Sequence, residues 1–219
     1  MADRNSKGRK ADIMKIIFAT GNQDKMREIR EILGGLNMEI ISMKEAGINM
    51  EIEENGATFT ENARIKATAV AQELQDSNRQ EGVIVLADDS GLEVDYLNKE
   101  PGIYSARYLG KDTSYTVKNT KIIERLQGVP DEKRTARFVC AIAAVLPDGT
   151  ILSVSRSMEG IIAHEILGEN GFGYDPIFFL PEYGKTSAEL TEREKNEISH
   201  RGKALRAMEQ MLRERLEEK

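Results

Sequence analysis

The chain has 219 residues and a formal net charge of −6, with 40% hydrophobic and 31% charged residues, which suits one large domain or two lobes sharing a core. This charge excludes bulk binding to duplex nucleic acid but allows a local basic pocket for a phosphorylated small molecule. No apolar run approaches the ~20 residues of a membrane span, so we expect no membrane association. The only cysteine, Cys140, lies in an apolar run, which predicts a buried structural thiol and a reducing, cytoplasmic location.

The first part of the chain predicts a leader followed by a strand–helix–strand unit. Residues 1–14 are polar and of mixed charge, which predicts a disordered leader ahead of one domain over residues 15–219. Residues 15–19, a lysine followed by four apolar residues, predict a strand. Residues 25–33 carry apolar side chains at helical spacing and predict a helix, and residues 39–42 predict a second short strand.

An acidic loop and a second helix come next. Residues 51–56 are rich in glutamate, and Thr58 with Glu61 matches a capping box at the start of a helix. The inner face of this helix is predicted to carry apolar residues from Ala63 to Leu74.

Two adjacent acids follow an apolar run in the middle of the chain. Residues 83–86 predict a buried strand that ends at Asp88 and Asp89, where Ser90-Gly91 turns the chain into a second short strand at residues 92–94. Two carboxylates at the end of a buried strand are costly to desolvate unless a proton or a cation compensates them. Mg²⁺ suits such a site, because it binds few carboxylates together with waters and substrate phosphates. The alternative is a solvated Asp-Asp-Ser-Gly turn without function.

The second half predicts a helix, a long hairpin and a final helix. Residues 113–127 predict the helix, and residues 136–146 and 151–158 predict two long strands joined by a Pro-Asp-Gly turn. A glycine-rich segment at residues 168–176 leads to a short apolar run, and the last helix begins near Ser199. Early strand–helix–strand units followed by a long hairpin predict an α/β fold with a mixed sheet rather than a doubly wound one.

A polar segment between the first strand and the first helix is a candidate anion site. Backbone N–H groups and the dipole at a helix N-terminus favour an anion, and a lysine there adds a mobile positive charge. The segment lacks the Walker and Rossmann glycine patterns, and the alternative is a plain strand-to-helix turn capped by asparagine. Its residues are Thr20, Gly21, Asn22, Gln23, Asp24 and Lys25.

The helix after this segment is not predicted to carry site residues. Residues 27–35 are similar to the second half of a Nudix box, but Ile32 and Ala19 stand where that box needs acids. Without those acids its metal site cannot be built, so we interpret the segment as an amphipathic helix.

Three further groups of residues are candidates. Glu53 and Glu54 are alternative metal partners for Asp89, or simply part of an acidic surface loop. The loop from Phe172 to Asp175 can stack a ring on a base and read the edge of that base with an acid, or it is a buried loop with aromatic plugs. Near the start of the last helix lie Lys195, His200 and Arg201. The cations can bind phosphate or a carbonyl oxygen and the histidine can form a hydrogen bond, or Lys195 and Arg201 are ordinary exposed cations.

Taken together, these motifs resemble the inosine/xanthosine triphosphate pyrophosphatase family, whose members remove deaminated purine nucleotides. The resemblance rests on five segments in the family's order, which cover nearly all of residues 15–212. These are Thr20-Gly21-Asn22-x-x-Lys25, Asp88-Asp89-Ser90-Gly91-Leu92, Pro101-Gly102-Ile103-Tyr104-Ser105-Ala106-Arg107, Gly171-Phe172-Gly173-Tyr174-Asp175-Pro176 and Ser199-His200-Arg201.

The resemblance implies Mg²⁺-dependent hydrolysis of ITP, dITP and XTP to the monophosphate and pyrophosphate. It also implies a homodimer of elongated two-lobed α/β chains, each built around a long mixed twisted β-sheet with the active-site cleft between the lobes. By motif match, Asp89 is the proton acceptor and a metal ligand, Glu53 is the second metal ligand, Ser90 contacts the substrate, and residues 20–25 hold the triphosphate. The base is implied to contact Phe172, Gly173, Tyr174, Asp175, Lys195, His200 and Arg201.

Physical chemistry suggests how such a site selects its base. Donors from His200 and Arg201 suit the C6 carbonyl of hypoxanthine, and an acceptor such as Asp175 or a backbone carbonyl suits its N1–H group. Adenine presents the opposite pattern, and mismatched buried polar groups can discriminate by roughly 10⁴-fold. Two alternative functions stay open at this point: a Maf-like nucleotide pyrophosphatase with another base preference, and a non-catalytic nucleotide sensor.

Overall fold

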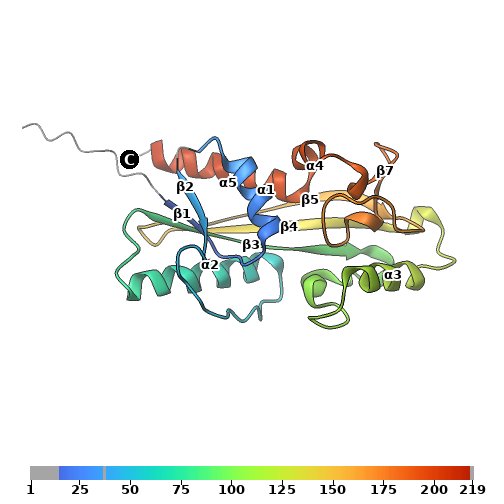
Figure 1. The fold of residues 1–219 in the computed structure, drawn as a ribbon, viewed down its shortest axis with the longest axis horizontal. Helices are drawn as coiled ribbons and strands as arrows, with labels where there is room; N and C mark the ends of the chain where they lie inside the picture. Colours follow the sequence, from blue (N-terminus) through green and yellow to red (C-terminus); the bar gives the residue numbers. More distant parts are fainter. Residues whose placement is uncertain (1–14, 37, 218–219) are drawn as a thin grey trace, which may run out of the picture.

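The computed structural model describes residues 15–36 and 38–217, so the predicted leader at residues 1–14 lies outside the described residues. Figure 1 shows an elongated molecule in which long strands run along most of its length. The strands are β1 Lys15–Phe18, β2 Glu39–Ser42, β3 Val83–Val94, β4 Thr135–Val145, β5 Ile151–Ile162, β6 Phe178–Leu180 and β7 Lys185–Thr186. The α-helices are α1 Gln23–Leu33, α2 Phe59–Asp76, α3 Tyr115–Arg125, α4 Glu192–Ile198 and α5 His200–Glu217.

These strands form a seven-stranded mixed sheet in the order β2-β1-β3-β4-β5-β6-β7. β1 is parallel to both of its neighbours, and the remaining pairs are antiparallel. Helices α1 and α5 cover one face of the sheet at the end that contains β1, and α2 covers the opposite face at that end. Helix α3 lies toward the other end of the molecule (Figure 1). The prediction of an α/β fold with a long mixed sheet is therefore confirmed.

The prediction of two short strands around the paired acids is wrong, because β3 is one continuous strand of 12 residues. β4 pairs with β3 from Val85 to Val94 and satisfies the backbone where a turn was predicted. Gly91 does not turn the chain; its missing Cβ leaves room for Ser105 Oγ and Gly102 O, which a side chain would overlap. The alternative of a solvated turn is also wrong, since Asp88 and Asp89 are both buried.

Because successive side chains of a strand point to opposite faces, the continuity of β3 separates the two acids. Ile84 and Leu86 pack in the core under α1 and α5, whereas Val83 and Val85 pack in the core against α2. Continuing this alternation, Asp88 points toward α1 and α5 and Asp89 points toward α2. The sheet therefore gives two adjacent carboxylates different surroundings.

The chain before the last helix also differs in detail from the prediction. Residues 192–198 form the separate helix α4, so Lys195 lies in α4 rather than at the start of the last helix. Ser199 is extended between the two helices, and its hydroxyl accepts a hydrogen bond from the N–H of Gly202 at 2.9 Å, which caps α5. No helix in the described part of the chain is long and apolar enough to cross a membrane.

Candidate active site

A cavity of about 380 Å³ lies at the edge of β3, beyond the point where β1 ends. β1 pairs with β3 only as far as Leu86, so within the described part of the chain the backbone edge of β3 next to the two acids has no strand partner on that side. Crevices of this kind, at the carboxyl ends of strands, are the usual ligand sites of α/β sheets. The predicted site residues that line the cavity are Thr20, Gly21, Asn22, Lys25, Asp89, Ser90, Phe172, Gly173, Tyr174, Asp175, Lys195, His200 and Arg201.

The segment between β1 and α1 forms one end of the cavity. Asn22 caps α1, because its side-chain oxygen accepts hydrogen bonds from the N–H groups of Asp24 at 2.9 Å and Lys25 at 3.1 Å. Gln23 and Asp24 do not line the cavity, and Asp24 lies 3.6 Å from Arg27 in an exposed ion pair. The segment is thus a strand-to-helix turn capped by Asn22, as the alternative interpretation predicted. Thr20, Gly21 and Lys25 nevertheless line the cavity.

Asp88 is surrounded by cations on the α1 and α5 side of the sheet. Its carboxylate lies 3.0 Å from Lys25 Nζ and 3.5 Å from Arg201 Nε, and its side chain is 1% exposed. Burial opposes ionisation, but the charges of Lys25, Arg201 and Lys66 outweigh it, so the pKa of Asp88 lies well below its usual range. Asp88 is therefore a fixed anion that orients two cations.

Asp89 has a different environment on the α2 side. Asn62 Nδ2 donates a hydrogen bond to Asp89 Oδ2 at 3.0 Å, and Lys66 Nζ lies 3.8 Å from Asp89 Oδ1. Burial raises the pKa of Asp89, and the charge of Lys66 and the hydrogen bond from Asn62 offset this only in part. A carboxylate with a raised pKa facing a cavity is suited to accept a proton.

The acidic loop contributes one carboxylate to this side of the cavity. Glu53 is exposed and does not line the cavity, whereas the neighbouring Glu54 does. Glu54 Oε1 lies 2.9 Å from Lys66 Nζ, so Lys66 bridges Glu54 and Asp89. Of the two candidate metal partners, the structure thus brings Glu54 close to Asp89.

The glycine-rich loop forms the other end of the cavity, and its two aromatic residues have different positions. Phe172 is half-buried and faces the cavity, with Lys195 Nζ 4.8 Å from the centroid of its ring. Tyr174 is buried, donates a hydrogen bond from its hydroxyl to Ser105 O at 2.7 Å, and packs edge-on against Tyr115. Phe172 is therefore the ring that is free to stack on a ligand, and Tyr174 braces the loop.

Asp175 also braces this loop. Its carboxylate accepts hydrogen bonds from the N–H of Phe172 at 2.8 Å, from Ser187 Oγ at 2.9 Å and from Lys195 Nζ at 2.7 Å. Its lone pairs are thus largely engaged within the protein. A backbone carbonyl is then the better candidate for an acceptor at the edge of a base.

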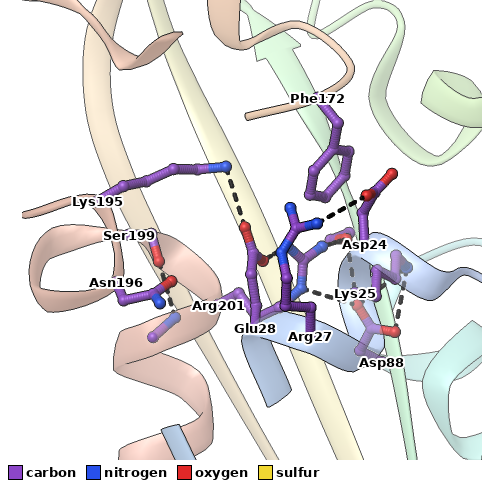
Figure 2. A network of polar contacts seen from close by, with 12 residues as sticks. Asp24, Lys25, Arg27, Glu28, Asp88, Phe172, Lys195, Asn196, Ser199 and Arg201 are labelled. Carbon is purple, nitrogen blue, oxygen red and sulfur yellow. Dashed lines mark hydrogen bonds and ion pairs between the residues drawn. The ribbon is translucent and has the colours of Figure 1, made fainter. Parts of the chain in front are cut away.

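A buried network of charges connects the two ends of the cavity (Figure 2). Glu28 in α1 lies between Lys195, whose Nζ is 3.1 Å from Oε1, and Arg201, whose Nη1 contacts Oε2. Arg201 in turn contacts Asp88, and its Nη2 donates a hydrogen bond to Ser90 Oγ at 3.0 Å. Burial opposes the charge on Glu28, but Arg201 and Lys195 outweigh it and keep its pKa low. The cations of the base end are thereby held in fixed positions.

His200 lies at the start of α5 and is almost fully buried. Its ring stacks on Phe138 at a centroid distance of 4.8 Å, and its Nδ1 has no hydrogen-bond partner among the described residues. Burial, together with the nearby charges of Arg201 and Lys195, holds the pKa of His200 well below its usual value. The imidazole is therefore neutral and can donate one hydrogen bond to a ligand. The other histidine, His164, is exposed beside Asp131.

The sequence alone did not identify Glu28, Asn62 or Lys66. Glu28 gave no signal, because one more glutamate in a charged amphipathic helix is unremarkable by pattern. Asn62 and Lys66 did give one: they are polar residues four positions apart on the inner, apolar face of α2. The prediction for Cys140 is confirmed, since the thiol is buried and burial raises its pKa to about 12.

Comparisons with known proteins agree with the motif resemblance. A model of the Ham1 family matches residues 16–211. A dITP/XTP pyrophosphatase of Clostridium perfringens is 48% identical over 91% of this chain and 97% of its own length, and one of Caldanaerobacter subterraneus is 45% identical over 94% and 100%. The solved structure of the Staphylococcus aureus Ham1 protein has a TM-score of 0.80 and 39% identity, over 92% of this chain and 99% of that one. A HAM1 protein from Coxiella burnetii has a TM-score of 0.80 and 41% identity, over 92% and 100%.

Proposed function

Since the chain belongs to the Ham1 family, we propose that it hydrolyses deaminated purine nucleoside triphosphates, ITP, dITP and XTP, to the monophosphate and pyrophosphate. The observation that carries the proposal is one cavity lined both by a carboxylate suited to accept a proton, Asp89, and by a half-buried aromatic ring, Phe172. The same cavity is lined by the cations Lys25, Lys195 and Arg201, which suit a triphosphate and a base carbonyl. This arrangement matches a nucleotide better than a smaller phosphate ester.

The donor set fits Mg²⁺. Among residues 15–36 and 38–217, no group of three or more His, Cys, Asp or Glu side chains is arranged to hold a metal. Mg²⁺ needs no such group, because it keeps waters and binds substrate phosphates together with one or two carboxylates. Asp89 and an acidic-loop carboxylate would hold it, and the bound ion would neutralise charge on the phosphates.

Two neighbouring glutamates compete for the second ligand position. Glu53 is the prediction from sequence, and the placement of Glu54 beside Lys66 and Asp89 favours Glu54 instead. Glu54→Gln should raise the Mg²⁺ concentration needed for half-maximal rate and reduce the stabilisation of the protein by Mg²⁺ in thermal unfolding. Glu53→Gln is the matched control, and a larger effect of Glu53→Gln on both readouts would reverse the assignment.

The residues of the chain divide the chemistry between them. Asp89 accepts a proton from the attacking water, a step that contributes about 10²–10⁴-fold to the rate. In the proposed reaction water attacks the α-phosphorus and pyrophosphate is the leaving group, so Asp89 would lie near that phosphate. Of the segment from Thr20 to Lys25, the residues that face the cavity, Thr20, Gly21 and Lys25, would bind the rest of the triphosphate, Lys25 through its ammonium group.

The base end selects a carbonyl at C6. Arg201 and Lys195 are held as cations by Glu28, and neutral His200 has a hydrogen-bond donor. Adenine presents an amino group at C6, so its binding leaves buried donors without acceptors, which is strongly unfavourable. Phe172 stacks on the purine ring.

A panel of nucleotides tests the proposal. ITP, dITP, XTP, GTP, ATP, dTTP and UTP are compared at subsaturating concentrations with Mg²⁺, and pyrophosphate and orthophosphate are measured separately. We expect pyrophosphate from ITP, dITP and XTP, with far slower turnover of ATP. Preference for dTTP or UTP would favour a Maf-like enzyme, and binding without turnover would favour a nucleotide sensor.

We also propose that the protein is a cytoplasmic homodimer with a small-molecule nucleotide as its substrate and without nucleic-acid or membrane partners. The family resemblance supports the dimer, and the single buried thiol supports a reducing compartment. Light scattering at micromolar concentration should give twice the mass of one chain. A monomeric mass would contradict the dimer and leave the enzymatic proposal intact.

A further inference from the structure

Asn62 joins two parts of the site through one side chain. It lies in the first turn of α2 and is 0% exposed. Its Oδ1 accepts a hydrogen bond from the N–H of Gly56 at 2.8 Å, and its Nδ2 donates one to Asp89 Oδ2 at 3.0 Å. The backbone N–H of Gly56 can only donate, so it must face the amide oxygen, and the NH₂ group must then face Asp89. In the opposite orientation the NH₂ group would face the N–H of Gly56, donor against donor, and the amide oxygen would face the carboxylate of Asp89, acceptor against acceptor.

This orientation determines which oxygen of Asp89 is available. Asp89 is held in the middle of β3 by its pairing with Ala141 of β4, so its backbone cannot move independently of the sheet. Asn62 occupies Oδ2, and the nearest cation to Oδ1 is Lys66 at 3.8 Å. Oδ1 is thus left for a water in the cavity.

The contact with Gly56 also positions the acidic loop. A Cβ at residue 56 would lie 2.7 Å from Glu61 Cβ and 2.8 Å from Asn62 Oδ1, so glycine permits the close approach of the loop. Two residues earlier, Glu54 pairs with Lys66, which lies one helical turn after Asn62 on the same face of α2. The side-chain amide of Asn62 therefore holds the carboxylate of Asp89 and also holds the loop that carries Glu54 next to α2.

We propose that Asn62 is a positioning residue for the hydrolysis, which acts by orienting the carboxylate of Asp89 toward the attacking water. The inference rests on the proposed pyrophosphatase activity. It differs from a merely structural role of a buried amide in one respect: loss of Asn62 should slow the chemical step without weakening nucleotide binding at the other end of the cavity.

Two variants test this inference, with the full-length chain and dITP as substrate. Asn62→Ala removes both hydrogen bonds. Asn62→Asp, of nearly the same size, keeps an acceptor for the Gly56 N–H but replaces the donor to Asp89 with a second carboxylate oxygen. We expect kcat to fall about 10–100-fold in both, the usual range for residues that orient a catalytic group, while KM stays unchanged. Gln72→Ala, which removes an exposed side-chain contact of the same helix, is the matched control.

Two further measurements separate positioning from folding. Thermal unfolding gives the folded fraction under assay conditions, and calorimetric titration with IMP gives the affinity of the base end without turnover. A reduced kcat in a folded variant with wild-type IMP affinity supports the inference. It is overturned if kcat is unchanged, if the loss follows the unfolded fraction, or if KM and the IMP dissociation constant rise with kcat preserved. If Asn62→Ala does not fold, Asn62→Asp alone decides. An inactive wild type would instead refute the proposed function.

Discussion

Asp88 and Asp89 are neighbours on one strand, yet the two faces of the sheet give them opposite properties. On the α1 and α5 face, Asp88 contacts Lys25 and Arg201 and its pKa is lowered. On the α2 face, Asp89 accepts one hydrogen bond from Asn62, its nearest cation is the more distant Lys66, and its pKa is raised. The comparison teaches that a continuous strand can place a structural anion and a proton acceptor side by side, because adjacent side chains never share a face.

The comparison extends to the rest of the cavity. The Asp88 face continues through Arg201, Glu28 and Lys195 to the loop around Phe172, so in the proposed function it would organise binding of the nucleotide (Figure 2). The Asp89 face carries Asn62, Lys66 and Glu54, so in the proposed function it would organise the chemistry. Variants on one face should therefore change binding or stability, and variants on the other should change turnover.

The largest effect is expected at Asp89. Asp89→Asn keeps the size of the side chain and an acceptor for Asn62 but removes the proton acceptor, so kcat for dITP should fall by at least about 10²–10⁴-fold. Thermal unfolding should show a folded protein. Near-normal turnover at saturating Mg²⁺ would show that the chemistry does not depend on this face.

The matching variant on the other face should act on stability. Asp88→Asn leaves the buried Arg201 and the half-buried Lys25 without their shared anion, and loss of one partner from a buried charge network costs about 3–5 kcal/mol. Denaturant unfolding should show this loss. Asp95→Asn, which alters the partly exposed contacts of Asp95 with Lys99 and Arg137, is the control and should cost at most about 1 kcal/mol. Equal stabilities of the two variants would contradict a structural role for Asp88.

A smaller effect is expected at the base end of the Asp88 face. Phe172→Ala removes the ring proposed to stack on the purine, which is worth about 1–3 kcal/mol, or about 5- to 150-fold in KM. The value of kcat should change much less. Tyr183→Ala removes an aromatic ring that is 44% exposed and does not line this cavity, and it serves as the control. A fall in kcat with KM unchanged would show that the two faces do not divide binding from chemistry.

The smallest effect concerns pH and His200. Its folded pKa lies below the unfolded value of about 6.5, so below that pH the unfolded chain binds a proton that the folded chain does not. Its contribution to stability is present above about pH 6.5 and is lost as pH falls, by up to about 1.4 kcal/mol per pH unit.

Denaturant unfolding at several pH values between 7.5 and 5.5 checks this prediction. His200→Asn should flatten the pH dependence relative to the wild type, whereas His164→Asn alters an exposed imidazole and is the control. An unchanged slope in His200→Asn would show that the imidazole is not held neutral by its surroundings.

Much of the fold could be predicted from local patterns. Apolar patterns correctly indicated β1, α1, α2 and the long hairpin of β4 and β5. The two helices each bury one apolar face, and β1 and much of β4 are continuously buried. The continuity of β3 could not be predicted, since Ser90-Gly91 is typical of a turn. What keeps these residues extended is their pairing with β4, a contact about 50 positions away in the sequence.

The candidate site was predictable to a similar extent. Motifs identified most residues that line the cavity, including Asp89, Phe172 and Arg201. Glu54 could not be distinguished from Glu53, because an irregular loop has no regular alternation of inward and outward side chains. The contact of the loop with Asn62 through Gly56 determines which carboxylate turns inward. Glu28 could not be found either, since its partners Lys195 and Arg201 lie more than 160 positions along the chain.

The position of the attacking water tests the central claim most directly. Hydrolysis of dITP in ¹⁸O-labelled water, followed by mass spectrometry of both products, locates the phosphorus that is attacked. If Asp89 activates a water at the α-phosphorus, the label should appear in dIMP and the pyrophosphate should be unlabelled. Label in pyrophosphate, or release of orthophosphate, would contradict the account.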